Sequence, residues 1–433
     1  MDKYLETTRI PREEKELRRE ITRMRDSFSF RFGILFAQAI ERPILLPILP
    51  ITITKFLLRC LFEKKHIINL QEEPTRNCVI GFSAESSRGL HFERMERILS
   101  ELRQHGIQTV HVTNDREIRI YDDKNGSILY SIPARGQIEE MNPRTWNKKC
   151  NRILSGILDT YHPRSFLFDG DYPFRGVLNA ITVRPEMNTF WLRESPINFK
   201  IPSLPIDGFD AFDAIIHPSI SRRDDPDSII GNSGTIFCNP IMGKHPNKTK
   251  IEALHNKYNT KGKKVIFVQI SKHILEYESI FQQLLLHKDI VLLCLSPSTP
   301  KQFKHNKQII YSHTLTTNEA ISLSDACLIS PDFHNIHSCF FMNKPTICIV
   351  DTKTHLDSIY REFGTKNLPL ILIESLTDDD FISISLERIL NEELQMQLIE
   401  RMKEITITDG TKELCSLISE LHSTNLPQEV QDD

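Results

Sequence analysis

Short apolar runs alternate with longer amphipathic segments from residue 78 onward. Residues 78–82 and 108–113 have the length and composition of buried strands, and residues 92–105 between them repeat apolar positions at helical spacing. A helix over 146–161 and a strand over 165–168 continue the same order. Strands that alternate with helices at this spacing predict βαβ units and a parallel sheet.

The pattern starts again after a loop-rich region, 199–263, which holds six prolines and one expected strand, 214–216. Residues 117–120 and 128–132 look like the arms of a hairpin around Asn125 and Gly126. Further strands are expected at 264–270, 290–295, 308–311, 326–330 and 346–350, and further helices at 275–287, 318–323, 336–342, 385–404 and 411–422. We therefore predict two doubly wound α/β domains, 77–240 and 248–423, with a linker at 239–247 and a disordered tail at 424–433.

An N-terminal extension, residues 1–70, precedes the first domain. Residues 1–26 are dense in charge and predict an exposed helix, and the acidic residues among them exclude a signal peptide. Residues 28–62 are far more apolar, but prolines and flanking basic residues interrupt the run, so the roughly 20 apolar residues of a transmembrane helix are not present. Two interpretations stay open for this segment. It lies in the headgroup plane of an anionic membrane, or it forms a helical hairpin packed on the protein or a partner subunit.

Composition narrows the function classes. The chain has 433 residues with 54 basic and 57 acidic side chains, and a net charge of −3 argues against a nucleic-acid binder. Nine cysteines show no CxxC spacing, so neither a zinc site nor a disulfide framework is predicted, and buried thiols in a reducing cytoplasm are expected. Only 16 residues are glycine, about 4 % against a usual share of roughly 7 %. That scarcity is unexpected for a nucleotide-binding enzyme, which uses glycines in its phosphate loops.

Two segments of the first domain carry a family resemblance. The loop at 81–91 ends in Gly89-Leu90-His91, and the segment 162–176 contains Asp169-Gly170-Asp171-Tyr172-Pro173. These segments resemble the corresponding motifs of GT-B glycosyltransferases, in which two Rossmann-like domains face a cleft. The similarity covers about residues 78–420. It is greatest to the branch that includes the transferase completing the peptidoglycan lipid precursor and related bacterial surface-polysaccharide transferases.

This resemblance implies roles on the acceptor side. His91 is the candidate base, because an imidazole titrates near neutral pH. Asp169 is expected at the carboxyl end of a parallel strand, where it would orient or deprotonate the acceptor. The alternatives are a helix-capping or surface role for His91 and a capping role for Asp169 at a helix beginning near Phe174. The other acceptor-side candidates are Glu85, Gly89, Asp171 and Tyr172.

The donor-side motifs depart from the family pattern. Residues 324–339 resemble the segment that grips the nucleotide, and Asn335 matches the family asparagine, but Cys339 replaces the ribose-binding glutamate. A thiol cannot make the charge-assisted hydrogen bonds of a carboxylate, so the donor is bound differently or the site is inactive. The donor-binding candidates are Ser271, Lys272, Asn335, Cys339, Asp357 and Arg361. The missing glycines fall on this half, at 271–273 and 333–334. The resemblance implies no metal requirement. It implies no cofactor either, because the nucleotide-diphosphate sugar is a substrate.

The expected function is glycosyl transfer from a nucleotide-diphosphate sugar to a lipid-linked or polysaccharide acceptor in cell-surface glycan synthesis. We expect a cytoplasmic protein bound peripherally to the inner face of the membrane, or to a partner subunit, through residues 1–65, and no nucleic-acid partner. The first alternative is a catalytically inactive GT-B-like scaffold of a membrane-associated synthase. The second is a nucleotide-sugar 2-epimerase.

Overall fold

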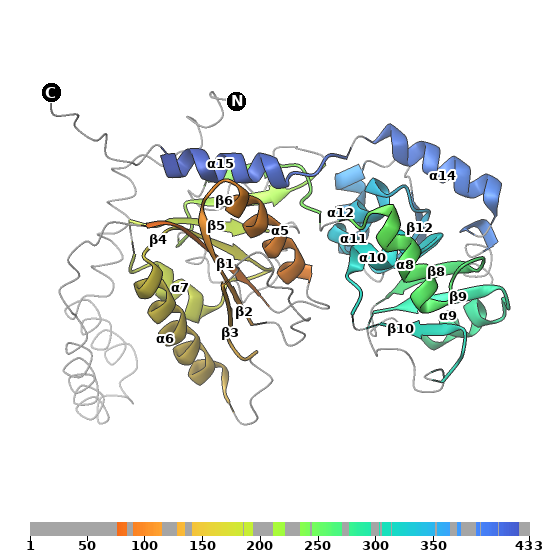
Figure 1. Cartoon of the computed structure of the whole chain (residues 1–433), viewed down its shortest axis with the longest axis horizontal. Helices are drawn as coiled ribbons and strands as arrows, with labels where there is room; N and C mark the ends of the chain where they lie inside the picture. The colour runs from red at the N-terminus through yellow and green to blue at the C-terminus, as the bar shows by residue number, and fades with distance from the viewer. Residues whose placement is uncertain are drawn as a thin grey trace, which may run out of the picture.

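The computed structural model describes two α/β domains (Figure 1). The described residues are 76–84, 90–114, 128–134, 141–184, 186–193, 211–220, 234–242, 245–270, 277–295, 303, 305–312, 314–350, 353–363, 370–373, 387–389, 391–405 and 407–423. The N-terminal extension and the predicted disordered tail lie outside them. No helix in these ranges is long and apolar enough to cross a membrane.

The first domain is built on a sheet whose described strands run in the order β3-β2-β1-β4-β5-β6-β7, with every pairing parallel. The strands are β1 Arg76–Ser83, β2 Gln108–Thr113, β3 Ile128–Ser131, β4 Pro163–Asp169, β5 Asn188–Leu192, β6 Ala214–Pro218 and β7 Gly234–Cys238. Val79 and Ile80 point to opposite faces of β1, yet both are fully buried. Burial on both faces is why runs such as 78–80 and 166–168 are apolar without alternation in the sequence.

Helices cover both faces of this sheet. α6 (Pro143–Tyr161) and α7 (Arg175–Ile181) pack on the face that carries Ile80 and Phe82. α5 (Leu90–Gln104) packs on the opposite face, against Val79 and Leu167. α5 therefore places its first turn close to the carboxyl ends of β1 and β4.

The second domain repeats the plan with the strand order β10-β9-β8-β11-β12-β13, again parallel throughout. Its strands are β8 Lys264–Gln269, β9 Ile290–Cys294, β10 Ile309–Tyr311, β11 Ala326–Ile329, β12 Thr346–Ile349 and β13 Ile371–Ile373. Its helices are α8 Lys248–Tyr258, α9 Tyr277–Leu285, α10 Thr317–Leu323, α11 Phe333–Phe341, α12 Lys353–Phe363 and α14 Glu392–Glu404. α9 covers one face, and α10 and α11 cover the other.

The last helix, α15 (Thr411–Ser423), does not belong to the second domain, although its place in the sequence predicts that it does. Its residues Leu414, Cys415 and Ile418 are buried against α5 and the first sheet (Figure 1). The chain therefore passes between the domains twice, once through 239–247 and once just before α15. The predicted range 248–423 is corrected accordingly.

Other differences from the sequence pattern have local causes. β3 pairs in parallel with β2, and the other arm of the predicted hairpin, 117–120, lies outside the described residues. The predicted loop region 199–263 also contains β7 and α8. α8 has no fully buried residue, and only Ile251, Leu254 and Tyr258 pack on the core, as partly buried side chains. Asn247 caps its start, and Asn259 ends it in a left-handed conformation. α12 and the three-residue β13 were not predicted.

We predict that Gly410→Ala destabilises the protein where α15 meets the interdomain linker. A Cβ atom at Gly410 would lie 2.0 Å from the carbonyl oxygen of Asn239, a backbone atom that cannot rotate away. The Gly410 N–H also donates to Pro240 O at 2.9 Å, which fixes the two chain crossings together. Overpacking of this kind costs about 1–3 kcal/mol of unfolding free energy, measurable by urea denaturation.

The matched control is Gly156→Ala in α6, where a Cβ atom meets nothing within 4 Å. Alanine is the better helix former, so this variant should gain about 0.5–1 kcal/mol or remain neutral. Equal unfolding midpoints for the two alanine variants would contradict the close contact at Gly410.

Candidate active site

Both sheets reverse their strand order at one point, between β1 and β4 in the first domain and between β8 and β11 in the second. In open parallel sheets, ligands bind outside the carboxyl ends of the strands at such a reversal. The residues there are Ser83 and Asp169 in the first sheet, which pair in register, and Gln269 and Ile329 in the second. Asp169 thus occupies the position that the sequence predicts for it.

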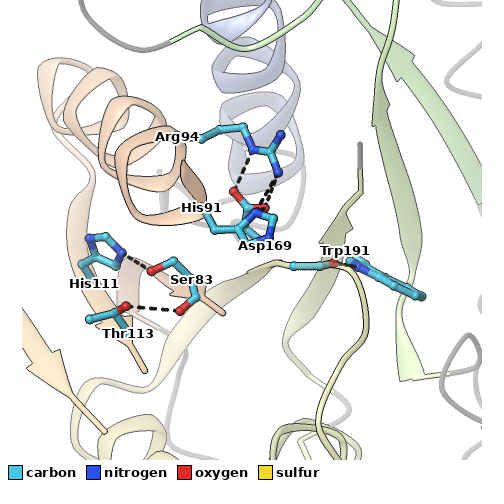
Figure 2. Close-up of polar contacts among 8 residues, drawn as sticks. Ser83, His91, Arg94, His111, Thr113, Asp169 and Trp191 are labelled. Atoms are coloured by element: carbon cyan, nitrogen blue, oxygen red, sulfur yellow. Dashed lines mark hydrogen bonds and ion pairs between the residues drawn. The ribbon is translucent and has the colours of Figure 1, made fainter. Parts of the chain in front are cut away.

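Asp169 is bound by two side chains from the first turns of α5 (Figure 2). Arg94 Nε donates to Oδ2 at 2.9 Å and Arg94 Nη2 donates to Oδ1 at 2.6 Å. His91 Nδ1 lies 2.9 Å from the same Oδ1. His91 and Arg94 are three residues apart on the helix, so they share one face. We call these three residues the His91 cluster.

The His91 cluster is buried, and the negative charge of Asp169 in it is paired with Arg94 and His91. Asp169 has no exposed side-chain surface and Arg94 has 2 %, while His91 keeps 12 %. Burial alone would raise the pKa of Asp169, but the charges of Arg94 and His91 and their hydrogen bonds hold it at about 2. Burial lowers the pKa of His91, yet the charge and hydrogen bond of Asp169 outweigh it, so the pKa lies above its usual 6.5. Asp169 is therefore ionised across the physiological range.

This geometry assigns the protons of the imidazole. An ionised carboxylate only accepts hydrogen bonds, so Nδ1 of His91 carries a proton and donates it to Asp169. In the neutral ring the lone pair then sits on Nε2. A histidine oriented in this way by a carboxylate is suited to act as a general base.

The backbone around Asp169 is held from two sides. Trp191 Nε1 donates to Gly170 O at 2.7 Å (Figure 2). The Ala84 N–H donates to Asp169 O at 2.8 Å. Gly170 is required for this approach, because a Cβ atom there would lie 2.5 Å from Cβ of Ala84. The helix after this turn, α7, has Phe174 as its N-cap residue, so Asp169 does not cap it.

A second polar cluster lies deeper beside the first. His111 Nε2 lies 2.9 Å from Ser83 Oγ (Figure 2). His111 Nδ1 lies 3.3 Å from Glu96 Oε2. The order serine, histidine and acid is that of a nucleophilic triad, but Ser83 has no exposed surface and its Oγ already has His111 as a partner, so we assign this cluster a structural role. His111 instead stacks on Phe92, with ring centroids 4.5 Å apart, and so supports the first turn of α5 next to His91.

The second domain has its own concentration of polar groups at the starts of α10 and α11. Several side-chain atoms there have no hydrogen-bond partner among the described residues, although each residue is at most 2 % exposed. We call these residues the α10–α11 cluster: Thr317, Asn318, His334, Asn335, His337 and Ser338. Buried polar groups in folded proteins are nearly always satisfied, so this concentration points to a polar ligand.

Charges and hydrogen bonds connect the two domains at this level. Burial first, and then the charge of Arg94, lowers the pKa of His334 to about 4, so the start of α11 lies within the electrostatic reach of the His91 cluster. Glu362 of α12 accepts hydrogen bonds from Ser219 Oγ and from the Ile220 N–H, both at 2.7 Å. Its Oε1 also lies 3.1 Å from His337 Nε2 on α11. The carboxyl end of β6 in the first domain is thus tied to α11 and α12.

The structure brings some of the predicted site residues together and places others apart. His91 and Asp169 are in contact, and Asn335 belongs to the α10–α11 cluster. Asp171 and Tyr172 are exposed in the turn after β4, and Asp357 is exposed on α12. Cys339 is fully buried in the apolar core of the second domain, on the side of α11 that packs on the sheet. Four predicted residues and one predicted side chain lie outside the described part of the chain, namely Glu85, Gly89, Ser271, Lys272 and the side chain of Arg361.

Sequence reasoning missed Arg94 and most of the α10–α11 cluster. A signal for Arg94 was present, because a cation three residues after a candidate base in a helix faces the same carboxylate. The signal for the cluster is weaker: four polar residues on α11, in two pairs on either side of Ile336, interrupt an otherwise apolar segment. The pairs are His334-Asn335 and His337-Ser338. Among the described residues, no group of three histidine, cysteine or acidic side chains is placed to hold a metal ion.

At the level of sequence, no protein-family model and no curated protein matches the chain. Solved structures do match it over most of their length. A putative UDP-N-acetylglucosamine 2-epimerase from Listeria monocytogenes aligns with a TM-score of 0.56 at 13 % identity, covering 81 % of this chain and 98 % of that one. A glycosyltransferase from Rickettsia africae gives 0.53 at 11 % identity, with 80 % and 99 % covered.

A third similar structure is Phytolacca americana UGT2 in complex with UDP-2-fluoro-glucose and pterostilbene, with a TM-score of 0.54 at 10 % identity, covering 81 % of this chain and 100 % of that one. Identities this low show the fold alone. The chain has the GT-B arrangement of two Rossmann-like domains, which confirms the fold predicted from the sequence.

Proposed function

We propose that this protein is a glycosyltransferase that moves a sugar from a nucleotide-diphosphate sugar to an acceptor hydroxyl. The observation that carries the proposal is the His91 cluster at the strand-order reversal of one sheet, within electrostatic reach of the α10–α11 cluster of the other. One side supplies a base and the other supplies hydrogen-bonding groups for an anion.

His91 performs the proton transfer in the proposed reaction. As the acceptor oxygen attacks the anomeric carbon of the sugar, its proton passes to Nε2 of His91. The bond from the anomeric carbon to the diphosphate oxygen breaks, and its electron pair leaves with the diphosphate. Asp169 stabilises the imidazolium that forms, through the hydrogen bond from Nδ1.

The start of α11 receives the leaving diphosphate. α11 has nine residues, and Asp332 caps its start by accepting from the Asn335 N–H at 3.3 Å. The other N–H groups of the first turn present the positive end of the helix dipole. The imidazole of His334, in the first turn, adds a hydrogen-bonding group there. Because the pKa of His334 is about 4, its ring is neutral near pH 7 and binds as a hydrogen-bonding group rather than as a cation. Cys339 is buried in the core, so it does not contact the ribose.

The acceptor class follows from the sequence resemblance and from residues 28–62. We extend the proposal to a lipid-linked or polymeric glycan acceptor at the inner face of the membrane, as in the bacterial surface-polysaccharide transferases that the motifs resemble. The apolar and basic character of residues 28–62 supports this extension.

A thermal-shift panel with UDP, GDP, CDP and CMP tests the donor site. A nucleoside diphosphate at 100 times its Kd should stabilise the native protein by about 2.7 kcal/mol and raise the Tm by about 5–10 °C. CMP, which lacks the second phosphate, should raise it least. Asn335→Asp should abolish the shift, because it adds a negative charge beside the diphosphate. Asn391→Asp at the exposed start of α14 should preserve it.

The absence of any shift at millimolar nucleotide would contradict the proposal and would favour the inactive scaffold. The epimerase alternative is separated by incubating the protein with a nucleotide sugar in the absence of an acceptor, since an epimerase alters the sugar without one. Altered sugar under those conditions would replace the proposed activity.

A further inference from the structure

One oxygen of Asp169 is shared between two donors in the His91 cluster. Oδ1 accepts from Arg94 Nη2 at 2.6 Å and from His91 Nδ1 at 2.9 Å, while Oδ2 is occupied by Arg94 Nε. Arg94 Nη2 also lies only 3.1 Å from Nδ1 of His91. The guanidinium of Arg94 therefore contacts both members of the histidine–aspartate pair.

We propose, as an extension of the proposed function, that Arg94 is a positioning residue that shares Asp169 with His91 and limits how tightly His91 holds a proton. Without it, a buried aspartate facing a histidine would draw the ring into a stable imidazolium. An imidazolium cannot accept the proton of the acceptor hydroxyl. The guanidinium opposes that outcome in two ways.

The first effect is electrostatic. Arg94 neutralises the carboxylate that attracts the proton and repels a positive charge on the ring 3.1 Å away. Burial lowers the pKa of His91, Asp169 raises it, Arg94 lowers it, and the charge of the exposed Asp171 raises it slightly. His111 on β2 and His334 on α11 are also within the field of Asp169, and burial lowers the pKa of each, so neither adds a positive charge near pH 7.

The second effect is geometric. The guanidinium binds the carboxylate at both oxygens, which fixes the plane of the carboxylate. With that plane fixed, Oδ1 faces Nδ1 of His91 and the proton of the neutral ring stays on Nδ1. The lone pair is thereby kept on Nε2, where the proposed reaction uses it.

The test is the titration of His91 followed by NMR in the full-length protein, with the signal assigned by its loss in His91→Gln. In the Arg94→Met variant the pKa of His91 should rise by about one unit or more, a tenfold tighter hold on the proton. The acidic limb of the kcat/KM–pH profile should move upward by the same amount. Arg97→Met is the matched control, since Arg97 lies on the same helix but pairs with Asp409, and it should leave both values unchanged.

Arg94→Lys provides a second variant for the case in which Arg94→Met does not fold. It keeps a cation but cannot bind both carboxylate oxygens, so the pKa of His91 should rise by a smaller amount. An unchanged or lowered pKa in the folded Arg94 variants overturns the proposal. The titration requires no turnover, so a protein that transfers no sugar contradicts the proposed function while the titration still decides the role of Arg94.

Discussion

Replacing His91 with glutamine is expected to lower kcat for sugar transfer by about 10²–10⁴-fold, the usual contribution of a general base. Glutamine preserves a polar group of similar reach, but it cannot accept a proton. Donor binding should change by no more than about twofold, because the α10–α11 cluster belongs to the other domain. Steady-state kinetics with the nucleotide sugar identified by the thermal-shift panel, together with nucleotide titrations, would measure the two effects separately.

The matched control for this variant is His105→Gln, at an exposed position just after the same helix. Its kcat should equal that of the wild type. Activity of the wild type should rise with pH through the pKa of His91, which lies above 6.5, because only the neutral ring accepts a proton. A His91→Gln enzyme that retains more than a fifth of the wild-type kcat would assign the proton transfer to another group.

Much of the fold was accessible from the sequence because the strands are buried on both faces. Runs such as 265–268 and 290–295 are apolar along their whole length, and such runs identify parallel strands without reference to tertiary structure. The mostly polar α8 was harder to recognise by this route, since its apolar stripe is limited to Ile251, Leu254 and Tyr258. The docking of α15 on α5 could not be predicted either, because amphipathicity shows that a helix has a buried face but not which sheet receives it.

The site was predictable one residue at a time but not as a cluster. His91 and Asp169 each stand in a recognisable motif, and Asp169 follows the strand-end rule. Their contact joins residues 78 positions apart, and the salt bridge of Asp169 with Arg94 depends on how α5 lies on β4. Cys339 is a wrong prediction. Its place in the motif puts it at the nucleotide, but it lies on the side of α11 that faces the core.

Asp169→Asn should be the most destabilising single substitution in the candidate site. It leaves the Arg94 guanidinium buried without its counter-charge, and breaking a buried pair in this way costs about 3–5 kcal/mol of unfolding free energy. That is a large part of the roughly 5–15 kcal/mol that stabilises a typical folded protein. Urea denaturation at pH 7 measures the loss. Asp159→Asn, which breaks an exposed pair with Arg184, should cost less than about 1 kcal/mol.

The double variant Asp169→Asn with Arg94→Met separates the unpaired charge from the loss of packing. Because it removes both charges, it should recover much of the stability lost by Asp169→Asn alone. The pKa of Asp169 also predicts how the free energy of unfolding falls at acid pH. That pKa is about 2 in the folded protein against an ordinary 3.8, so the carboxylate contributes about 2 kcal/mol above pH 3.8 that is lost as the pH falls through 2. Asp169→Asn should flatten that fall, and a double variant less stable than Asp169→Asn would contradict the assignment of the loss to an unpaired guanidinium.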